Sequence, residues 1–224
     1  MPKVRAAALL LSAATVLSAC ATSMDTEPPP GVSLAGHWKL DPAASDDPQK
    51  VLDKMRAEAF KIIDRRNQQR PARAGSEADN NGDEAPAPPP PGTQRPDPLR
   101  RSPMAHILRE LVERGDFLTV RQGAGEFVLD YGTSKRTFTP GEHSVVSAEG
   151  GVGDQTSGWK GQQYVIRVKN QLGPEVVEEY GLSGGGKELL MKLHIGSGEL
   201  PAIDLKRIYR PTDEAAPQQL PTND

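Results

Sequence analysis

Residues 162–169 read QQYVIRVK, residues 175–182 read EVVEEYGL and residues 187–195 read KELLMKLHI. In each segment apolar residues alternate with polar ones, which is the period of a β-strand with one buried face. The segments are separated by short turn sequences, Gly173-Pro174 and Gly184-Gly185-Gly186. Because such short connections join antiparallel neighbours, these stretches predict an antiparallel meander.

The same alternation continues along the chain in both directions. Further strands are predicted at 34–40, 117–122, 126–131, 135–139, 143–147 and 202–209. About eight or nine antiparallel strands are enough to curl into a small barrel or half-barrel. The sequence therefore predicts a mainly β protein, with its β domain over 116–210 and its first strand at 34–40.

Two helices are expected after the first strand. The first helix lies within 34–69, where Asp47 suits the N-cap and Pro48 suits the first helical position. After Pro48, apolar residues recur at helical spacing, and basic residues occupy the opposite face. That basic face is expected to be a solvated surface, with anionic lipid head groups as the alternative partner. The second helix, over 102–115, begins at Ser102-Pro103 and ends at Gly115.

Three other stretches lack any apolar period. The chain contains 22 glycines and 21 prolines, and many of them lie between the predicted elements. We expect a disordered proline-rich segment over 70–101, a tether over 20–33 and a disordered tail over 211–224, since such compositions cannot bury enough apolar area to offset the entropy of ordering.

The N-terminus has the pattern of a secretory signal. Lys3 and Arg5 precede an apolar run, 6–16, which is too short to span a bilayer as a helix. The following Leu17-Ser18-Ala19-Cys20 resembles the lipobox of bacterial lipoproteins. This resemblance implies that residues 1–19 are a signal peptide and that Cys20 is acylated, with palmitate-type chains, as the mature N-terminus. By the same resemblance, Ala21 implies an outer-membrane protein facing the periplasm.

Composition excludes several kinds of chemistry. Removal of residues 1–19 changes the net charge from −3 to −5, so the body has no basic excess for nucleic acid. Cys20 is the only cysteine, so its acylation leaves no thiol for a disulfide or a metal. The four histidines are scattered without the spacing of a metal site, and no cofactor is expected: His37, His106, His143 and His194.

Gly36-His37-Trp38 resembles the Gly-x-Trp motif of lipocalins and related calycin barrels. In that family an arginine near the last strand packs over the tryptophan where the barrel closes, and Arg207 has the corresponding position here. The resemblance implies that Gly36, Trp38 and Arg207 close the barrel. It also implies an apolar ligand such as a lipid.

A second candidate region lies around two glycine-containing stretches, 139–143 and 150–159. Glu142, His143, Asp154 and Ser157 are residue types used in acid–base and nucleophilic catalysis. The alternative is a flexible loop with Trp159 packed at its base. The glycines are not followed by the Gly-Lys-Ser/Thr sequence of a phosphate-binding loop.

These observations lead to two functional interpretations. The first is a non-enzymatic envelope lipoprotein whose β domain binds a protein partner or a small apolar ligand. The second is a hydrolase-type envelope enzyme that uses Glu142, His143 and Asp154.

Overall fold

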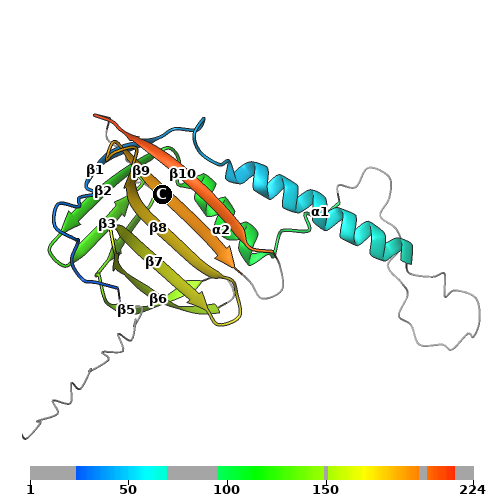
Figure 1. The fold of residues 1–224 in the computed structure, drawn as a ribbon. Coiled ribbons are helices and arrows are strands. Elements are labelled where there is room, and N and C mark those ends of the chain that lie inside the picture. Colours follow the sequence, from blue (N-terminus) through cyan, green and yellow to red (C-terminus); the bar gives the residue numbers. More distant parts are fainter. Residues whose placement is uncertain (1–23, 70–94, 149–150, 197–200, 215–224) are drawn as a thin grey trace, which may run out of the picture.

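The computed structural model describes residues 24–69, 95–148, 151–196 and 201–214 (Figure 1). The helices are α1 (Pro48–Gln69) and α2 (Pro103–Glu113). The strands are β1 (Gly36–Leu40), β2 (Phe117–Gly123), β3 (Glu126–Asp130), β4 (Lys135–Phe138), β5 (His143–Ala148), β6 (Gly151–Lys160), β7 (Gln163–Asn170), β8 (Glu175–Ser183), β9 (Glu188–Gly196) and β10 (Ile203–Pro211). Cys20 lies outside the described residues.

All ten strands belong to one antiparallel sheet, in the order β4-β3-β2-β1-β10-β9-β8-β7-β6-β5. The first and last strands pair in the middle of this order, with Leu40 opposite Tyr209. The two edges are β4 and β5, which follow one another in the chain but are not paired in the described sheet. The mainly β, antiparallel half-barrel with two helices after its first strand is therefore confirmed.

The strand that the sequence analysis missed is β6. Residues 150–159 were expected to form a loop, but Gly151–Lys160 pairs with β5 on one side and with β7 on the other. Its inward positions include the small or polar residues Gly153, Gln155 and Ser157, so it lacks the apolar alternation of the other strands. Neighbouring strands, rather than its own apolar side chains, determine its conformation.

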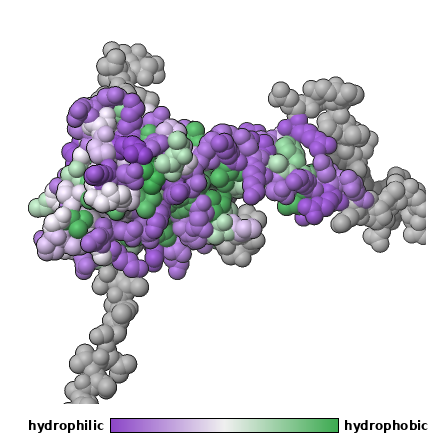
Figure 2. Space-filling model, turned by 45° about the horizontal axis from the view of Figure 1, so that its top comes forward, coloured by the Kyte–Doolittle hydropathy of each residue, from purple (hydrophilic) through white to green (hydrophobic). Residues whose placement is uncertain are grey.

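The two helices lie at one end of the half-barrel, which we call the helix end. Helix α2 packs against the sheet through Met104, Ala105, Leu108 and Leu111, all of which are buried. Helix α1 projects away from the barrel, mostly hydrophilic on its visible surface (Figures 1 and 2). Both predicted N-caps are observed: Asp47 accepts from the Gln49 amide, and Ser102 accepts from the Ala105 amide.

The opposite end of the half-barrel is crossed by residues 24–35, which we call the N-terminal strap. Asp25 exchanges two backbone hydrogen bonds of 2.8 Å with Trp159 on β6. At its other end, Leu34 is fully buried and its amide donates to the side chain of Gln122 on β2. The predicted tether over 20–33 therefore lies against the barrel from Asp25 onward.

The chain that returns from the proline-rich segment is also ordered in part. The predicted disorder over 70–101 does not extend to 95–101, because Leu99 is buried and Arg95 pairs with Asp64 of α1 at 2.9 Å. Residues 70–94 lie outside the described residues. In the part of the chain that is described, no helix is long and apolar enough to cross a bilayer.

Candidate functional site

Aromatic side chains fill the strap end of the half-barrel. Phe127 and Tyr164 stack with their ring centroids 3.7 Å apart, and the Trp159 ring meets Tyr164 edge-on at 5.4 Å. Alternation along β3, β6 and β7 places these three rings on the inner face. These rings pack closely and fill the interior at this end.

A cavity of about 920 Å³ lies at the helix end. Its apolar lining comes from Ile107 of α2 and from three valines, Val146, Val168 and Val176. Its polar lining includes Arg136 of edge strand β4, Gln155 of β6 and Asn170 of β7. Because residues of both β4 and β5 line it, the cavity lies where the two unpaired edges separate.

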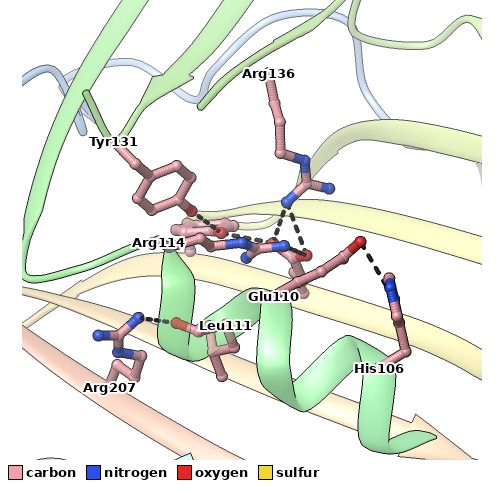
Figure 3. A network of polar contacts seen from close by, with 9 residues as sticks. His106, Glu110, Leu111, Arg114, Tyr131, Arg136 and Arg207 are labelled. Atoms are coloured by element: carbon pink, nitrogen blue, oxygen red, sulfur yellow. Dashed lines mark hydrogen bonds and ion pairs between the residues drawn. The ribbon is translucent and has the colours of Figure 1, made fainter. Parts of the chain in front are cut away.

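A cluster of charged and phenolic side chains forms one wall of this cavity (Figure 3). Glu178 of β8 is 3% exposed, and its carboxylate contacts Arg114 at 3.1 Å and Arg136 at 2.8 Å. Tyr180 donates to the same carboxylate at 2.6 Å, and the Tyr180 and Tyr131 hydroxyls are 2.9 Å apart. We call these five residues the Glu178 cluster. It joins β4, β8 and Tyr131, the residue after β3, to Arg114, the residue that caps α2.

The electrostatics of the cluster keep it ionised. Burial alone would raise the pKa of Glu178, but the positive charges of Arg114 and Arg136 and the bond from Tyr180 outweigh it, so the pKa lies well below its ordinary value. Burial would likewise lower the pKa of Arg114, but the Glu178 charge holds it well above its ordinary value. Two guanidinium groups therefore face one carboxylate within the cluster, while Glu110 and Glu113 of α2 add two acidic side chains to the cavity lining.

Arg207 lies near the cluster and fastens α2 to the sheet. Its guanidinium donates to the backbone carbonyls of Leu111 at 3.2 Å and Gly115 at 2.9 Å, at the C-terminal end of α2 (Figure 3). The aromatic ring under the guanidinium belongs to Tyr209, 5.5 Å from the ring centroid, rather than to Trp38 as the lipocalin resemblance implies. Trp38 instead donates from Nε1 to the carbonyl of Leu34 in the strap.

Gly36 shows how the start of β1 fits the strap. Its φ is +151°, a backbone conformation that residues with a side chain rarely adopt, and a Cβ atom here would be in van der Waals contact with Trp38 Nε1 at 3.4 Å. Gly36 and Trp38 therefore meet the strap where β1 begins, whereas Arg207 reaches the helix end. The first and last strands meet in mid-sheet, so these three residues lie away from the unpaired edges β4 and β5.

Three of the residues proposed for catalysis, His143, Asp154 and Ser157, line one groove of about 440 Å³, but no hydrogen bond joins their side chains in the part of the chain that the structure describes. Ser157 points into the core, where it accepts a hydrogen bond from Tyr164 at 3.0 Å, and Trp159 is buried beside it. His143 lies opposite Thr156 in the β5–β6 ladder, so its side chain is on the outer face with Asp154 and the exposed Glu142. The Ser157 hydroxyl is therefore paired with Tyr164 rather than with His143 or Asp154. Burial also raises the pKa of Tyr164 to about 12, which keeps it a hydrogen-bond donor.

Metal binding has no support in the described ranges, since no group of three or more acidic, histidine or cysteine side chains there could hold an ion. The Glu178 cluster was not predicted from the sequence. Its signal was an acid at an inward position of β8, between the inward Val176 and Tyr180. Alternation alone could not reveal the two arginines that neutralise it, because they come from β4 and from the end of α2.

The fold and site define a ten-stranded antiparallel half-barrel with a helix packed at one end and a charged cavity beneath it. No protein-family model matches the chain, and no curated protein matches it in sequence. Solved structures similar to it include apo lipid binding protein 8 of Caenorhabditis elegans, with 14% identity over 81% of this chain and 99% of that chain, at a TM-score of 0.43. They also include the REP1-NXSQ fatty acid transporter, with 13% identity over 81% of this chain and 97% of that chain, at a TM-score of 0.41. A third is the zebrafish ileal bile acid-binding protein in complex with cholic acid, with 11% identity over 80% of this chain and 98% of that chain, at a TM-score of 0.39.

Proposed function

We propose that this protein is a non-enzymatic lipoprotein of the outer membrane, anchored by acyl chains on Cys20 and facing the periplasm, whose half-barrel binds a small amphipathic ligand. The cavity at the helix end is the observation that carries the binding function. Its volume of about 920 Å³ falls within the range of small-molecule sites. A protein partner in the envelope is the alternative occupant of the same site.

The chemistry of the cavity favours a ligand with an apolar body and a polar head group. Val146, Val168 and Val176 offer a surface for the apolar part. Arg136, whose side chain is 24% exposed, can pair with a carboxylate or a sulfonate, while Glu110 and Glu113 offer acceptors on the α2 side of the cavity. The buried Oδ1 atom of Asn170 has no hydrogen-bond partner among the described residues, so a ligand donor could pair with it.

Binding is tested with 1-anilinonaphthalene-8-sulfonate, an anionic amphipathic dye. Saturable fluorescence enhancement is expected for the wild type. Gln155→Trp, which fills the cavity from its inner wall, should weaken binding at least tenfold. Thr137→Trp, on the outer side of β4, is the matched control and should bind as the wild type does. Equal binding by both variants, at unchanged melting temperatures, would overturn the cavity as the site.

Anchoring is tested by the mass of the N-terminal peptide from membrane-extracted protein. Acylation adds the mass of the acyl chains to Cys20, and Cys20→Ala should move the protein from the membrane to the soluble fraction. An unmodified Cys20, or a membrane-bound Cys20→Ala protein, would contradict the anchor. Fractionation of inner and outer membranes tests the localisation.

A further inference from the structure

The outer face of β5, β6 and β7 carries an unusual set of exposed apolar side chains. Val145 is 73% exposed, Val152 is 45% exposed and Leu172, in the β7–β8 turn, is 88% exposed. Val145 and Val152 share the outer face, because they lie opposite Asp154 and Ser147 in the β5–β6 ladder. The amide of Gln171, next to Leu172, donates to the carbonyl of Val152, so the turn adjoins the strands. We call these three residues the outer apolar patch.

Charged side chains of both signs surround the patch. Arg167 and Lys169 of β7 lie opposite Thr156 and Asp154 of β6, on the same outer face. Arg167 pairs with Glu175 at 3.3 Å. Two basic and two acidic residues therefore balance, which suits a zwitterionic lipid surface rather than a strongly anionic one.

The chain leaves the barrel beside this face. Met24, where the described strap begins, lines one groove of about 440 Å³ together with His143, Asp154, Arg167 and Lys169. Cys20 lies four residues before Met24, so an extended chain can separate them by at most about 14 Å. An acylated Cys20 would therefore hold the bilayer surface within reach of this groove, whose Asp154 lies opposite Val145 of the patch on the same outer face.

We propose that the outer apolar patch rests on the surface of the membrane in which Cys20 is anchored, with zwitterionic phospholipid head groups as its partner. This inference rests on the acylation of Cys20 under the proposed function. Three small side chains contribute too little burial to bind a membrane alone, since each buried methylene is worth only about 0.8 kcal/mol. Once the acyl chains hold the protein at the surface, the high effective concentration makes the weak contact sufficient to orient the barrel.

The test uses the full acylated chain in phosphatidylethanolamine-containing vesicles with brominated acyl chains. Because Cys20 is the only cysteine and its sulfur is acylated, an introduced cysteine is the one thiol that a bimane label can modify. Val145→Cys reports the patch. Val112→Cys, at a valine of α2 that is 42% exposed and lines a groove with residues of β1 and β10, is the matched control.

Bromolipid quenching at position 145 is expected to be at least twice that at position 112. Adding Val152→Asp and Leu172→Asp should lower the quenching at 145 to the level of the control, while the protein stays membrane-bound. Equal quenching at 145 and 112 in an acylated chain would refute the contact between the patch and the membrane, without contradicting the acyl anchor on Cys20. A chain whose Cys20 carries no acyl group would instead overturn the anchor, and this inference with it.

Discussion

The residue with the largest influence on the candidate site is Glu178. It is the acidic partner of two buried guanidinium groups, and no aliphatic side chain of similar size could neutralise them. Removing one member of such a buried set leaves the remaining charges uncompensated, which is more damaging than the loss of an exposed ion pair.

Glu178→Gln is expected to lower the free energy of unfolding at pH 7 by about 3 kcal/mol, because Arg114 and Arg136 lose their counter-ion. The pKa of Glu178 is lower in the folded protein than its ordinary value of 4.5, so its stabilisation is present above that pH and is lost as the pH falls below it. The difference between wild type and variant in urea unfolding should therefore shrink from pH 7 to pH 3.

The neighbouring Glu179 supplies the control for this measurement. It points to the outer face, where its carboxylate is 4.0 Å from Lys192. Glu179→Gln should change the free energy of unfolding by less than about 0.5 kcal/mol. An effect of Glu178→Gln no larger than that of its neighbour would contradict the assigned role.

A second prediction at this scale concerns Gly158, where the strap meets β6. A Cβ atom there would lie 2.7 Å from the Cβ of Met24 and 2.9 Å from the carbonyl oxygen of Asp25. Gly158→Ala should displace the strap and cost about 1–3 kcal/mol of stability, measured by urea unfolding. Gly123→Ala is the control, since no atom lies within 4 Å of its added methyl group; comparable losses at both sites would refute the close approach.

At the scale of elements, the sequence pattern predicted those segments whose own side chains carry the period. Strands such as β9, with buried residues at every second position, were found within about one residue of their ends. Strand β6 was missed because small or polar residues, Gly153, Gln155 and Ser157, occupy its inward positions, so it has no apolar alternation. The predicted helices were found through their capping residues, Asp47-Pro48 and Ser102-Pro103, which act locally.

The attachment of α2 could not be predicted from any local pattern, because it depends on an arginine about ninety residues away. Arg207→Met is expected to remove the bonds to Leu111 and Gly115 and to cost about 2 kcal/mol. Amide hydrogen exchange should quicken in α2 before it quickens in β9. Arg210→Met, on the same strand but paired with Asp41 at the surface, should leave the exchange of α2 unchanged.

At the scale of the whole molecule, the fold class followed from the sequence but the site did not. Alternation and turn residues are local and periodic, so they give the meander. The Glu178 cluster and the cavity depend on how β4, β8 and the end of α2 meet, which no spacing along the chain records. The position of the strap could not be predicted from the sequence either, because Met24 and Gly158, which lie close together in space, are far apart along the chain.

The long insertion between the two helices is expected to be dispensable for folding. Arg95 and Asp97 pair with Asp64 and Arg56, so the chain returns to α1 by contacts of its own. Replacing residues 70–94 with an eight-residue Gly/Ser linker should change the melting temperature by no more than about 2 °C, because closure entropy varies only slowly with loop length. A large fall in calorimetric melting temperature would show that the insertion supports the barrel.

The unpaired edges have a mechanical consequence. At the strap end, β4 and β5 are joined by only four residues, and the amide of Gly141 in this connection donates to Ser157 of β6 at 2.7 Å. At the helix end they share no ladder hydrogen bonds in the described sheet. The gap between β4 and β5 can therefore widen at the helix end, about their short connection at the strap end, without breaking any backbone pairing between these two strands. Side-chain contacts across the interior oppose such widening, among them the bridge from Arg136 of β4 to Glu178 of β8 and the packing of Phe138 of β4 on Tyr164 of β7.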